Sequence, residues 1–118
     1  MKVLLVEDNE RVTRFVTKGL QEAGHTADHA DNGRDGLFLA ASERYDVIAM
    51  TASLPLYDER FEQMLNIGGR LFVTVGMAPV MDARLVRRTA EDSFVVQSLF
   101  ETVIDPLVHA ARPPVFTF

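Results

Sequence analysis

Hydrophobic and polar positions in the first part of the chain alternate between two periods. Residues 2–6 form a short unbroken apolar run, which is typical of a parallel strand buried on both faces. From Val12 to Ala23, apolar residues recur at the spacing of one helix face, with Asn9 as a cap before them and Gly24 as a stop after them. The pattern predicts a buried strand followed by an amphipathic helix.

The same alternation continues to about residue 51. Residues 25–30 predict a second strand, and the Asp31-Asn32-Gly33 turn leads into a second helix. Residues 46–51 predict a third strand. A βαβαβ order of this kind implies right-handed crossovers and a parallel sheet.

The pattern changes in the second half of the chain. A short helix is expected over residues 60–65, and a strongly β-prone run follows at residues 70–76. Residues 83–89 and 94–103 are two further β-prone runs. The compact polar segment 90–93 joins them, which predicts an antiparallel hairpin.

Composition places the chain among single-domain globular proteins. It has 118 residues, of which 47% are hydrophobic and 25% charged, enough for one modest core. The absence of cysteine excludes disulfides, thiolate catalysis and cysteine-based zinc sites. The apolar runs are too short to cross a bilayer and the start shows no signal-peptide pattern, so we expect a cytoplasmic location and no membrane partner.

The charge distribution argues against a nucleic-acid partner. The formal net charge is −5, and the one cluster of basic residues is Arg84, Arg87 and Arg88. On a strand, Arg84 and Arg88 share one face and Arg87 lies on the other. We interpret the cluster as a solvated strand edge.

Residues 1–50 closely resemble the receiver domain of bacterial two-component response regulators, of the kind fused to winged-helix DNA-binding domains. The resemblance rests on Lys2-Val3-Leu4-Leu5-Val6-Glu7-Asp8-Asn9, Leu20-Gln21-Glu22-Ala23-Gly24, Ala30-Asp31-Asn32-Gly33, Asp35-Gly36-Leu37 and Tyr45-Asp46-Val47-Ile48. It implies a parallel sheet whose strand ends gather an acidic pair, an acceptor Asp, a Thr or Ser, and a Lys. In that family the pair holds Mg²⁺, the acceptor is the nucleophile and the Lys stabilises the acyl phosphate.

Of that set the chain retains the acidic pair, Glu7 and Asp8. The acceptor position holds Thr51, whose hydroxyl is a far weaker nucleophile without an adjacent base. The only lysines are Lys2 and Lys18, which rules out the family's Lys-Pro step. Thr74 on the next strand is interpreted as a β-branched packing residue. We therefore expect no phosphorylation by the family's mechanism.

Two interpretations of Glu7 and Asp8 stay open. Two carboxylates at a strand end attract Mg²⁺, so they predict a weak vestigial site that lacks its third ligand. Alternatively, they form a solvated acidic loop that favours the N-terminus of the following helix. The three histidines, His25, His29 and His109, do not suggest a metal or acid–base site. His25 and His29 lie four apart on a strand, and no third ligand is evident.

Residues 51–118 resemble the C-terminal part of protein-L-isoaspartate O-methyltransferases. The resemblance rests on Thr51-Ala52-Ser53-Leu54-Pro55, Tyr57-Asp58, Arg60-Phe61-Glu62-Gln63-Met64-Leu65, Gly68-Gly69-Arg70-Leu71-Phe72-Val73-Thr74-Val75-Gly76, Pro79-Val80-Met81, Leu85-Val86-Arg87-Arg88, Ser98-Leu99-Phe100-Glu101-Thr102-Val103, Pro106-Leu107-Val108 and Pro113-Pro114. It implies the fourth and fifth strands of a Rossmann-like methyltransferase sheet, followed by its closing antiparallel hairpin.

The part that would bind S-adenosylmethionine has no counterpart in this chain. A methyltransferase needs a glycine-rich turn after its first strand, and Glu7-Asp8-Asn9-Glu10 stands there. Asp31 lies near the place of the ribose-binding acid, but an Asp-Asn-Gly segment is typical of a turn. Thr51 and Ser53 match the family's strand-end motif, and alone they do not make a site. We expect no cofactor and no methyl transfer.

The segment Tyr45-Asp46-Val47-Ile48 fits both families, so the two parts can join on one strand without a break in hydrophobic phase. We expect an α/β fold, a three-layer Rossmann-like or flavodoxin-like sheet. Numbered along the chain, its strands are expected in the order 2-1-3-4-6-5, with strand 6 antiparallel in the C-terminal hairpin. Residues 1–118 would be a single domain with a receiver-like half (1–50) and a methyltransferase-like half (51–118).

The leading hypothesis for function is an engineered or recombined chimera that is not an enzyme, a scaffold with neither family's activity. One alternative is a pseudo-receiver, a binding module of two-component signalling that contacts a kinase or a DNA-binding partner without phosphorylation. A residual S-adenosylmethionine-dependent methyltransferase is the other alternative, and the missing cofactor loop disfavours it.

Joining the two parts omits helices that each family places over its sheet. Apolar side chains near the last strands should then be exposed, the candidates being Val73, Val75, Leu85, Val95, Leu99 and Phe100. Such a patch favours a homodimer through the uncovered sheet face or the C-terminal segment. The tail from Pro106, with its Pro113-Pro114 step, is expected to lie extended along the surface. Alternatively, its Val115, Phe116 and Phe118 fold back over the patch.

Overall fold

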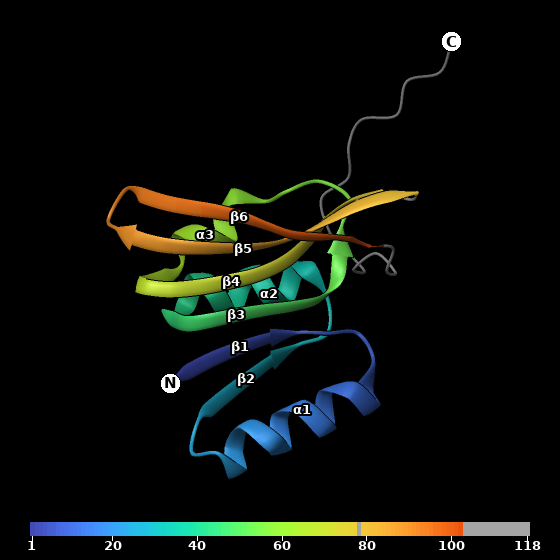
Figure 1. Ribbon diagram of the computed structural model, residues 1–118. Helices are drawn as coiled ribbons and strands as arrows, with labels where there is room; N and C mark the ends of the chain where they lie inside the picture. Colours follow the sequence, from blue (N-terminus) through green and yellow to red (C-terminus); the bar gives the residue numbers. More distant parts are fainter. Residues whose placement is uncertain (78, 103–118) are drawn as a thin grey trace.

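The computed structural model describes residues 1–77 and 79–102, which form one six-stranded sheet with helices packed against it (Figure 1). The strands are β1 (Lys2–Val6), β2 (Thr26–Ala30), β3 (Tyr45–Leu54), β4 (Leu65–Met77), β5 (Val80–Ala90) and β6 (Ser93–Thr102). The helices are α1 (Glu10–Glu22), α2 (Gly33–Ser42) and α3 (Glu59–Gln63). The predicted mixed α/β class is confirmed. The expectations for the tail from Pro106, and for His109, lie outside the described residues.

The helices of the first half begin and end where the pattern predicts. The side chain of Asn9 accepts hydrogen bonds from the backbone N–H groups of Arg11 and Val12, at 3.0 and 3.1 Å, which caps α1. Gly24 follows α1 with a φ of 86°, a conformation that favours glycine. Asn32 caps α2 in the same way. No helix in the described part of the chain is long and apolar enough to span a membrane.

The connections place helices on both faces of the sheet. The strand order is β2-β1-β3-β4-β5-β6. α1 connects β1 to β2 on one side of it, and α2 connects β2 to β3 on the other side of β1. Right-handed crossovers in opposite directions lie on opposite faces. α1 packs along β2, whereas α2 contacts α3 over the other face. Residues Val3 to Val6 point alternately to the two faces and are all buried, so the sheet is covered on both sides at β1.

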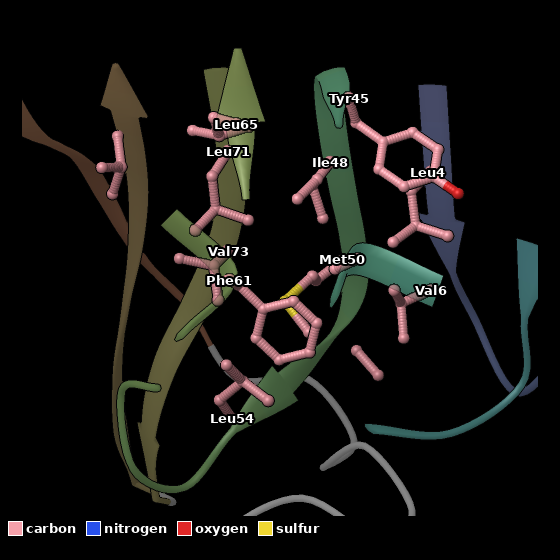
Figure 2. Close-up of a cluster of buried hydrophobic side chains, with 13 residues drawn as sticks. Leu4, Val6, Tyr45, Ile48, Met50, Leu54, Phe61, Leu65, Leu71 and Val73 are labelled. Carbon is pink, nitrogen blue, oxygen red and sulfur yellow. The ribbon is translucent and has the colours of Figure 1, made fainter. Parts of the chain in front are cut away.

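The main hydrophobic core lies between the sheet and the face that α2 and α3 cover (Figure 2). Its buried members are Leu4, Val6, Ala40, Tyr45, Ile48, Met50, Ala52, Leu54, Phe61, Leu65, Leu71, Val73 and Val86. Figure 2 shows the ring of Phe61, from the short helix α3, among Met50, Leu54 and Val73. Both halves of the sequence contribute to this cluster, so they share one core.

The predicted strand order 2-1-3-4-6-5 is wrong. β5 pairs antiparallel with β4 as far as Met77↔Val80, and β6 lies beyond β5 at the edge of the sheet. The connection between Met77 and Val80 has two residues, which can reverse the chain only into an adjacent strand. β5 is therefore the strand that runs against the others, and β6 runs in the direction of β4. The predicted hairpin itself is confirmed, since Ala90 pairs with Ser93 across a two-residue turn.

The predicted apolar patch is wrong in part. Val73 is fully buried and Val75 packs against the core, because they point to the sheet face that α3 covers. The other four members are at least partly exposed: Leu85, Val95, Leu99 and Phe100. The exposed apolar surface therefore lies farther toward the sheet edge than the sequence predicts.

The apolar stripe of α1 is less buried than its pattern predicts. The buried residue of α1 is Thr13, which is polar. Of the apolar residues, Val12 is exposed and Phe15 is 83% exposed. Because α1 packs mainly along β2 at the sheet edge, part of its stripe extends past the strands.

The interpretation of the basic cluster as a solvated strand edge is also wrong. β5 is an interior strand, so its arginines lie between two neighbouring strands. Arg87 is exposed, and Arg84 forms an ion pair with Asp82 at 2.8 Å. Arg88 is 5% exposed and is the buried cation of the described residues.

The guanidinium of Arg88 connects the hairpin to the end of α3. It donates hydrogen bonds to the carbonyl oxygens of Gln63 and Leu65 at 2.9 and 2.8 Å. It also donates to the carbonyl oxygens of Ala90 and Glu91 in the hairpin turn. A planar group with five donors suits this arrangement, in which one side chain satisfies carbonyl groups from two segments.

We expect Arg88→Met to lower the free energy of unfolding by about 2–3 kcal/mol, because each buried carbonyl left without a donor costs roughly 1–3 kcal/mol. Arg87→Met on the same strand is the matched control and should change stability by less than about 0.5 kcal/mol. Equilibrium denaturation followed by circular dichroism measures both. Equal effects of the two substitutions would contradict the role assigned to Arg88.

Candidate functional site

The carboxyl ends of β1, β2 and β3 bring the predicted site residues to one edge of the sheet. Glu7 and Asp8 follow β1, and Asp31 follows β2. Thr51 lies one residue beyond Val6↔Met50, the last pair between β1 and β3. An open cavity of about 490 Å³ lies at this edge, lined by Asp8, Glu10, Thr13, Arg14, His29 and Asp31. The edge is acidic, as the sequence predicts.

Glu7 is buried in the loop between β1 and α1, and it does not line this cavity. Its side chain is 6% exposed, and Oε1 accepts the backbone N–H of Asn9 at 2.9 Å. Its own N–H donates to the carbonyl oxygen of Ala30 at 3.0 Å. Burial raises the pKa of Glu7 above its ordinary value, and the neighbouring Asp8 raises it further. Glu7 thus orders the start of α1.

His29 is a residue of this edge that the sequence interpretation missed. Its Nε2 lies 2.8 Å from the carbonyl oxygen of Glu7 and 3.2 Å from Oγ1 of Thr13. Since a carbonyl oxygen can only accept, this nitrogen carries the hydrogen. The hydroxyl of Thr13 donates to the carbonyl oxygen of Asn9 at 2.9 Å. His29 therefore connects the end of β2 to the loop that begins α1.

The sequence pattern places His25 and His29 on one face of a strand, whereas in the structure only His29 lies within β2. His25 precedes β2, and its Nδ1 lies 3.1 Å from the N-terminal amino group. His29 lies near the other end of β2. The signal for His29 in the sequence was its place beside Ala30 and Asp31, at the strand end where the acidic residues gather.

Thr51 lies within β3 and not at its end. Its hydroxyl is 3.5 Å from the carbonyl oxygen of Val6. The strand continues to Leu54, and Ser53 pairs with Thr74 of β4. Thr74 is buried, consistent with its interpretation as a packing residue. The hydroxyl of Thr51 therefore interacts with a carbonyl oxygen, which cannot act as its base.

The two lysines lie away from Thr51. Lys2 begins β1, so it lies at the amino end of the strand, away from the carboxyl end where Thr51 lies, and it forms an ion pair with Glu43. Lys18 is exposed in the second half of α1, where its Nζ is 3.9 Å from Oε1 of Glu22. An ammonium group for a phosphoryl oxygen is thus not available at the carboxyl edge.

A magnesium site in a protein uses several oxygen ligands. Within residues 1–77 and 79–102, no three His, Asp or Glu side chains are grouped so as to hold a metal ion. One carboxylate oxygen of Glu7 accepts a hydrogen bond from the backbone N–H of Asn9. Asp8 is the exposed member of the acidic pair. The vestigial site at Glu7 and Asp8 stays a prediction. Glu10 in the first turn of α1 extends the acidic loop, which fits the alternative interpretation.

The turn after β1 differs from a cofactor-binding glycine loop. The backbone N–H groups of Arg11 and Val12, in the first turn of α1, donate hydrogen bonds to the side-chain oxygen of Asn9. They are therefore not available to a ligand at this turn. Asp31, near the expected ribose position, accepts a hydrogen bond from the Asn32 side chain at 2.8 Å within its turn. At both places, the turn after β1 and Asp31, the polar groups form local hydrogen bonds. A dinucleotide-type fold uses the corresponding backbone N–H groups and carboxylate to bind its ligand.

Two sets of known proteins are similar to this chain, one in sequence and one in fold. It is 48% identical over 58 residues to transcriptional regulatory protein HprR of Escherichia coli K12, and 46% identical over 55 residues to the probable transcriptional regulatory protein SilR of Salmonella typhimurium. These matches cover 49% and 47% of this chain but 26% and 24% of the relatives, so the chain spans about a quarter of their length. No protein-family model matches the chain.

The structural neighbours are methyltransferases. A putative protein-L-isoaspartate O-methyltransferase from Plasmodium falciparum, solved with S-adenosyl-L-homocysteine, has a TM-score of 0.57 at 13% identity, over 89% of this chain and 51% of that one. A second protein-L-isoaspartate O-methyltransferase has a TM-score of 0.59 at 16% identity, over 90% and 41% of the two chains. At these identities the likeness concerns the fold alone. The chain therefore combines response-regulator sequence similarity over about half its length with a Rossmann-like fold over most of it.

We expect Glu7→Gln to raise the melting temperature at neutral pH. A carboxyl group whose pKa is higher in the folded than in the unfolded state destabilises the fold while it is ionised, and this effect disappears as the pH falls through the folded pKa toward the unfolded one. The amide removes the ionisation but keeps an oxygen that can accept from Asn9. Thermal unfolding over a pH series should show the gain at neutral pH and its loss in acid.

Asp8→Asn is the comparison for this series. Asp8 is exposed and acts on Glu7 through charge, so this variant should give a smaller gain with the same direction. A Glu7→Gln melting temperature that equals or falls below that of the parent chain at neutral pH would refute the assigned effect of burial.

Proposed function

We propose that this chain is a recombined α/β scaffold that joins a receiver-derived part, about residues 1–50, to a part derived from a protein-L-isoaspartate O-methyltransferase, about residues 51–118. We further propose that it is neither a phosphoacceptor nor a methyltransferase. The observation that carries the proposal is the environment of Thr51, whose hydroxyl contacts a carbonyl oxygen at an edge without lysine. The similarity to response regulators over about half of the chain supports the hybrid origin.

The chemistry of phosphoryl transfer supports this assignment. A carboxylate attacks phosphorus without losing a proton, whereas a threonine hydroxyl has to transfer its proton to a base as it attacks. The contact of Thr51 with the Val6 carbonyl supplies no base. Lys2 and Lys18 are held by Glu43 and Glu22, so neither neutralises charge on a phosphoryl group at this edge.

The loop after β1 supports the absence of methyl transfer. Cofactor binding at this place in a Rossmann-like fold uses free backbone N–H groups and a close approach of glycine backbone. Asn9 occupies the N–H groups of Arg11 and Val12. Glu7 and Asp8 add negative charge where the cofactor carries a carboxylate.

The junction between the two parts is consistent with a shared scaffold. The hydroxyl of Tyr45 donates to Asp28 in the first half at 2.7 Å, and burial raises the pKa of this phenol. The carboxylate of Asp46 accepts the backbone N–H of Lys2 at 2.8 Å and the side-chain amide of Asn66 at 3.0 Å. These two hydrogen bonds lower the pKa of Asp46. The residues that fit both families thus bond to both parts of the chain.

We expect no mass increase when the full chain is incubated with acetyl phosphate and Mg²⁺, because Thr51 has no base and no lysine partner. Thr51→Asp restores the carboxylate but not the lysine, so it should also stay largely unmodified. Intact-protein mass spectrometry measures both, with a phosphorylatable receiver domain as the positive control. A phosphoryl adduct on the parent chain that Thr51→Ala abolishes would overturn this part of the proposal.

We also expect S-adenosylmethionine to leave the melting temperature unchanged, since a ligand that binds the folded state raises it. The measurement is thermal unfolding across a range of ligand concentrations. A saturable rise would contradict the proposal and favour a residual methyltransferase. Saturable binding of a sensor kinase without phosphorylation would instead favour the pseudo-receiver.

A further inference from the structure

Within the described residues, β6 forms one outer edge of the sheet. In the part of the chain that the structure describes, β6 pairs with β5 on one side and with no strand on the other. None of its ten residues is buried, and Phe94 and Thr102 alone are partly buried. The outer N–H and C=O groups of such a strand are able to pair with another strand.

The two edges of the sheet differ in how they are protected. β2, the opposite edge, has five residues, includes Asp28 and lies against α1. β6 has ten residues, and residues 93–100 carry no charge. Short length, charge and a covering helix are features that prevent edge-to-edge association; β6 is long, carries its single charge at Glu101 near its end, and has no covering helix among the described residues.

The exposed apolar side chains of β6 lie on both faces of the sheet. Val95 pairs with Arg87 and Val96 with Val86, so these neighbours point to opposite faces. Val95 and Val96 are 49% and 54% exposed, and Phe100 is 57% exposed. A partner laid over one face would leave the other face exposed. A strand added at the edge shields side chains on both faces at once.

We propose that β6 pairs antiparallel with β6 of a second copy, forming a two-fold symmetric dimer whose sheet continues across the interface. The pairing is self-complementary: about a centre between Gln97 and Ser98, the pair Val95-Val96 lies opposite Leu99-Phe100 of the partner subunit. The charge of Glu101 selects the orientation. Parallel pairing would place the two Glu101 carboxylates side by side, whereas antiparallel pairing separates them by about 24 Å, or roughly seven residues of strand.

The mass of the full chain in solution tests the interface. Sedimentation equilibrium should give about 26 kDa, twice the 13.2 kDa of one chain. The double substitution Val95→Lys with Val96→Lys places like charges on both faces of the edge, and we expect it to raise the dimer dissociation constant at least about tenfold. Both side chains are exposed, so circular dichroism should show an unchanged fold. Phe38→Lys on α2, a side chain that is 72% exposed, is the matched control and should leave the dimer intact.

Cross-linking tests the orientation, since the chain contains no cysteine to interfere. Gln97→Cys places a thiol near the two-fold axis of the proposed dimer, so a short bismaleimide should join two copies. Ser93→Cys places thiols at opposite ends of the interface, roughly 30 Å apart at 3.4 Å per residue, so it should give little product. Cross-linking of Gln97→Cys that the Val95→Lys, Val96→Lys pair suppresses would support the interface.

Several results would overturn the inference. A monomer at all accessible concentrations would mean that β6 does not pair with a second copy. A dimer that the double substitution leaves unchanged would place the interface elsewhere, on the uncovered face or the C-terminal segment. Equal cross-linking of Ser93→Cys and Gln97→Cys would exclude the antiparallel pairing, and assemblies larger than a dimer would exclude a closed two-fold interface. None of these results depends on whether the chain has catalytic activity.

Discussion

The pairing of β3 with β1 on one side and β4 on the other is the constraint on which the rest of the structure depends. β3 is the strand through which the two halves of the sequence meet, and Ile48 and Met50 are fully buried under α2 and α3. A slip of one residue in either ladder would turn these side chains out of the core. Asp46 helps to hold the register, because its carboxylate binds the start of β1 and, through Asn66, the start of β4.

The same ladder explains why polar and acidic residues gather at the carboxyl ends of β1, β2 and β3. Parallel pairing brings the ends of β1 and β2 together beside Thr51, so acidic residues gather there. The polar groups at that edge then bond to one another locally. Glu7 binds Asn9, Asn9 binds the first turn of α1, and His29 binds the backbone of Glu7. Groups engaged in this way order the loop that begins α1.

Local patterns predicted the elements of the fold well. The strands and helices of the first half, the caps at Asn9 and Gly24, and the final hairpin follow from spacing and turn chemistry that act within a few residues. The predicted order of the last two strands was wrong, because β4 and β5 extend beyond the expected runs to Met77 and Val80, and a connection of two residues reverses the chain only into the adjacent strand. The role of Arg88 was also missed, since its carbonyl partners lie up to 25 residues away in the chain.

The sequence by itself determined the class of fold, the missing carboxylate at Thr51 and the missing lysine, because each depends on residue type or on short-range periodicity. The tertiary structure alone decided which groups are buried and which strands lie at the two edges of the described sheet. Glu7, His29 and Arg88 gain their roles from partners that only the packed sheet brings within hydrogen-bond distance. The exposure of β6 likewise follows from its place at the end of the strand order, which depends on long-range pairing and not on its own composition.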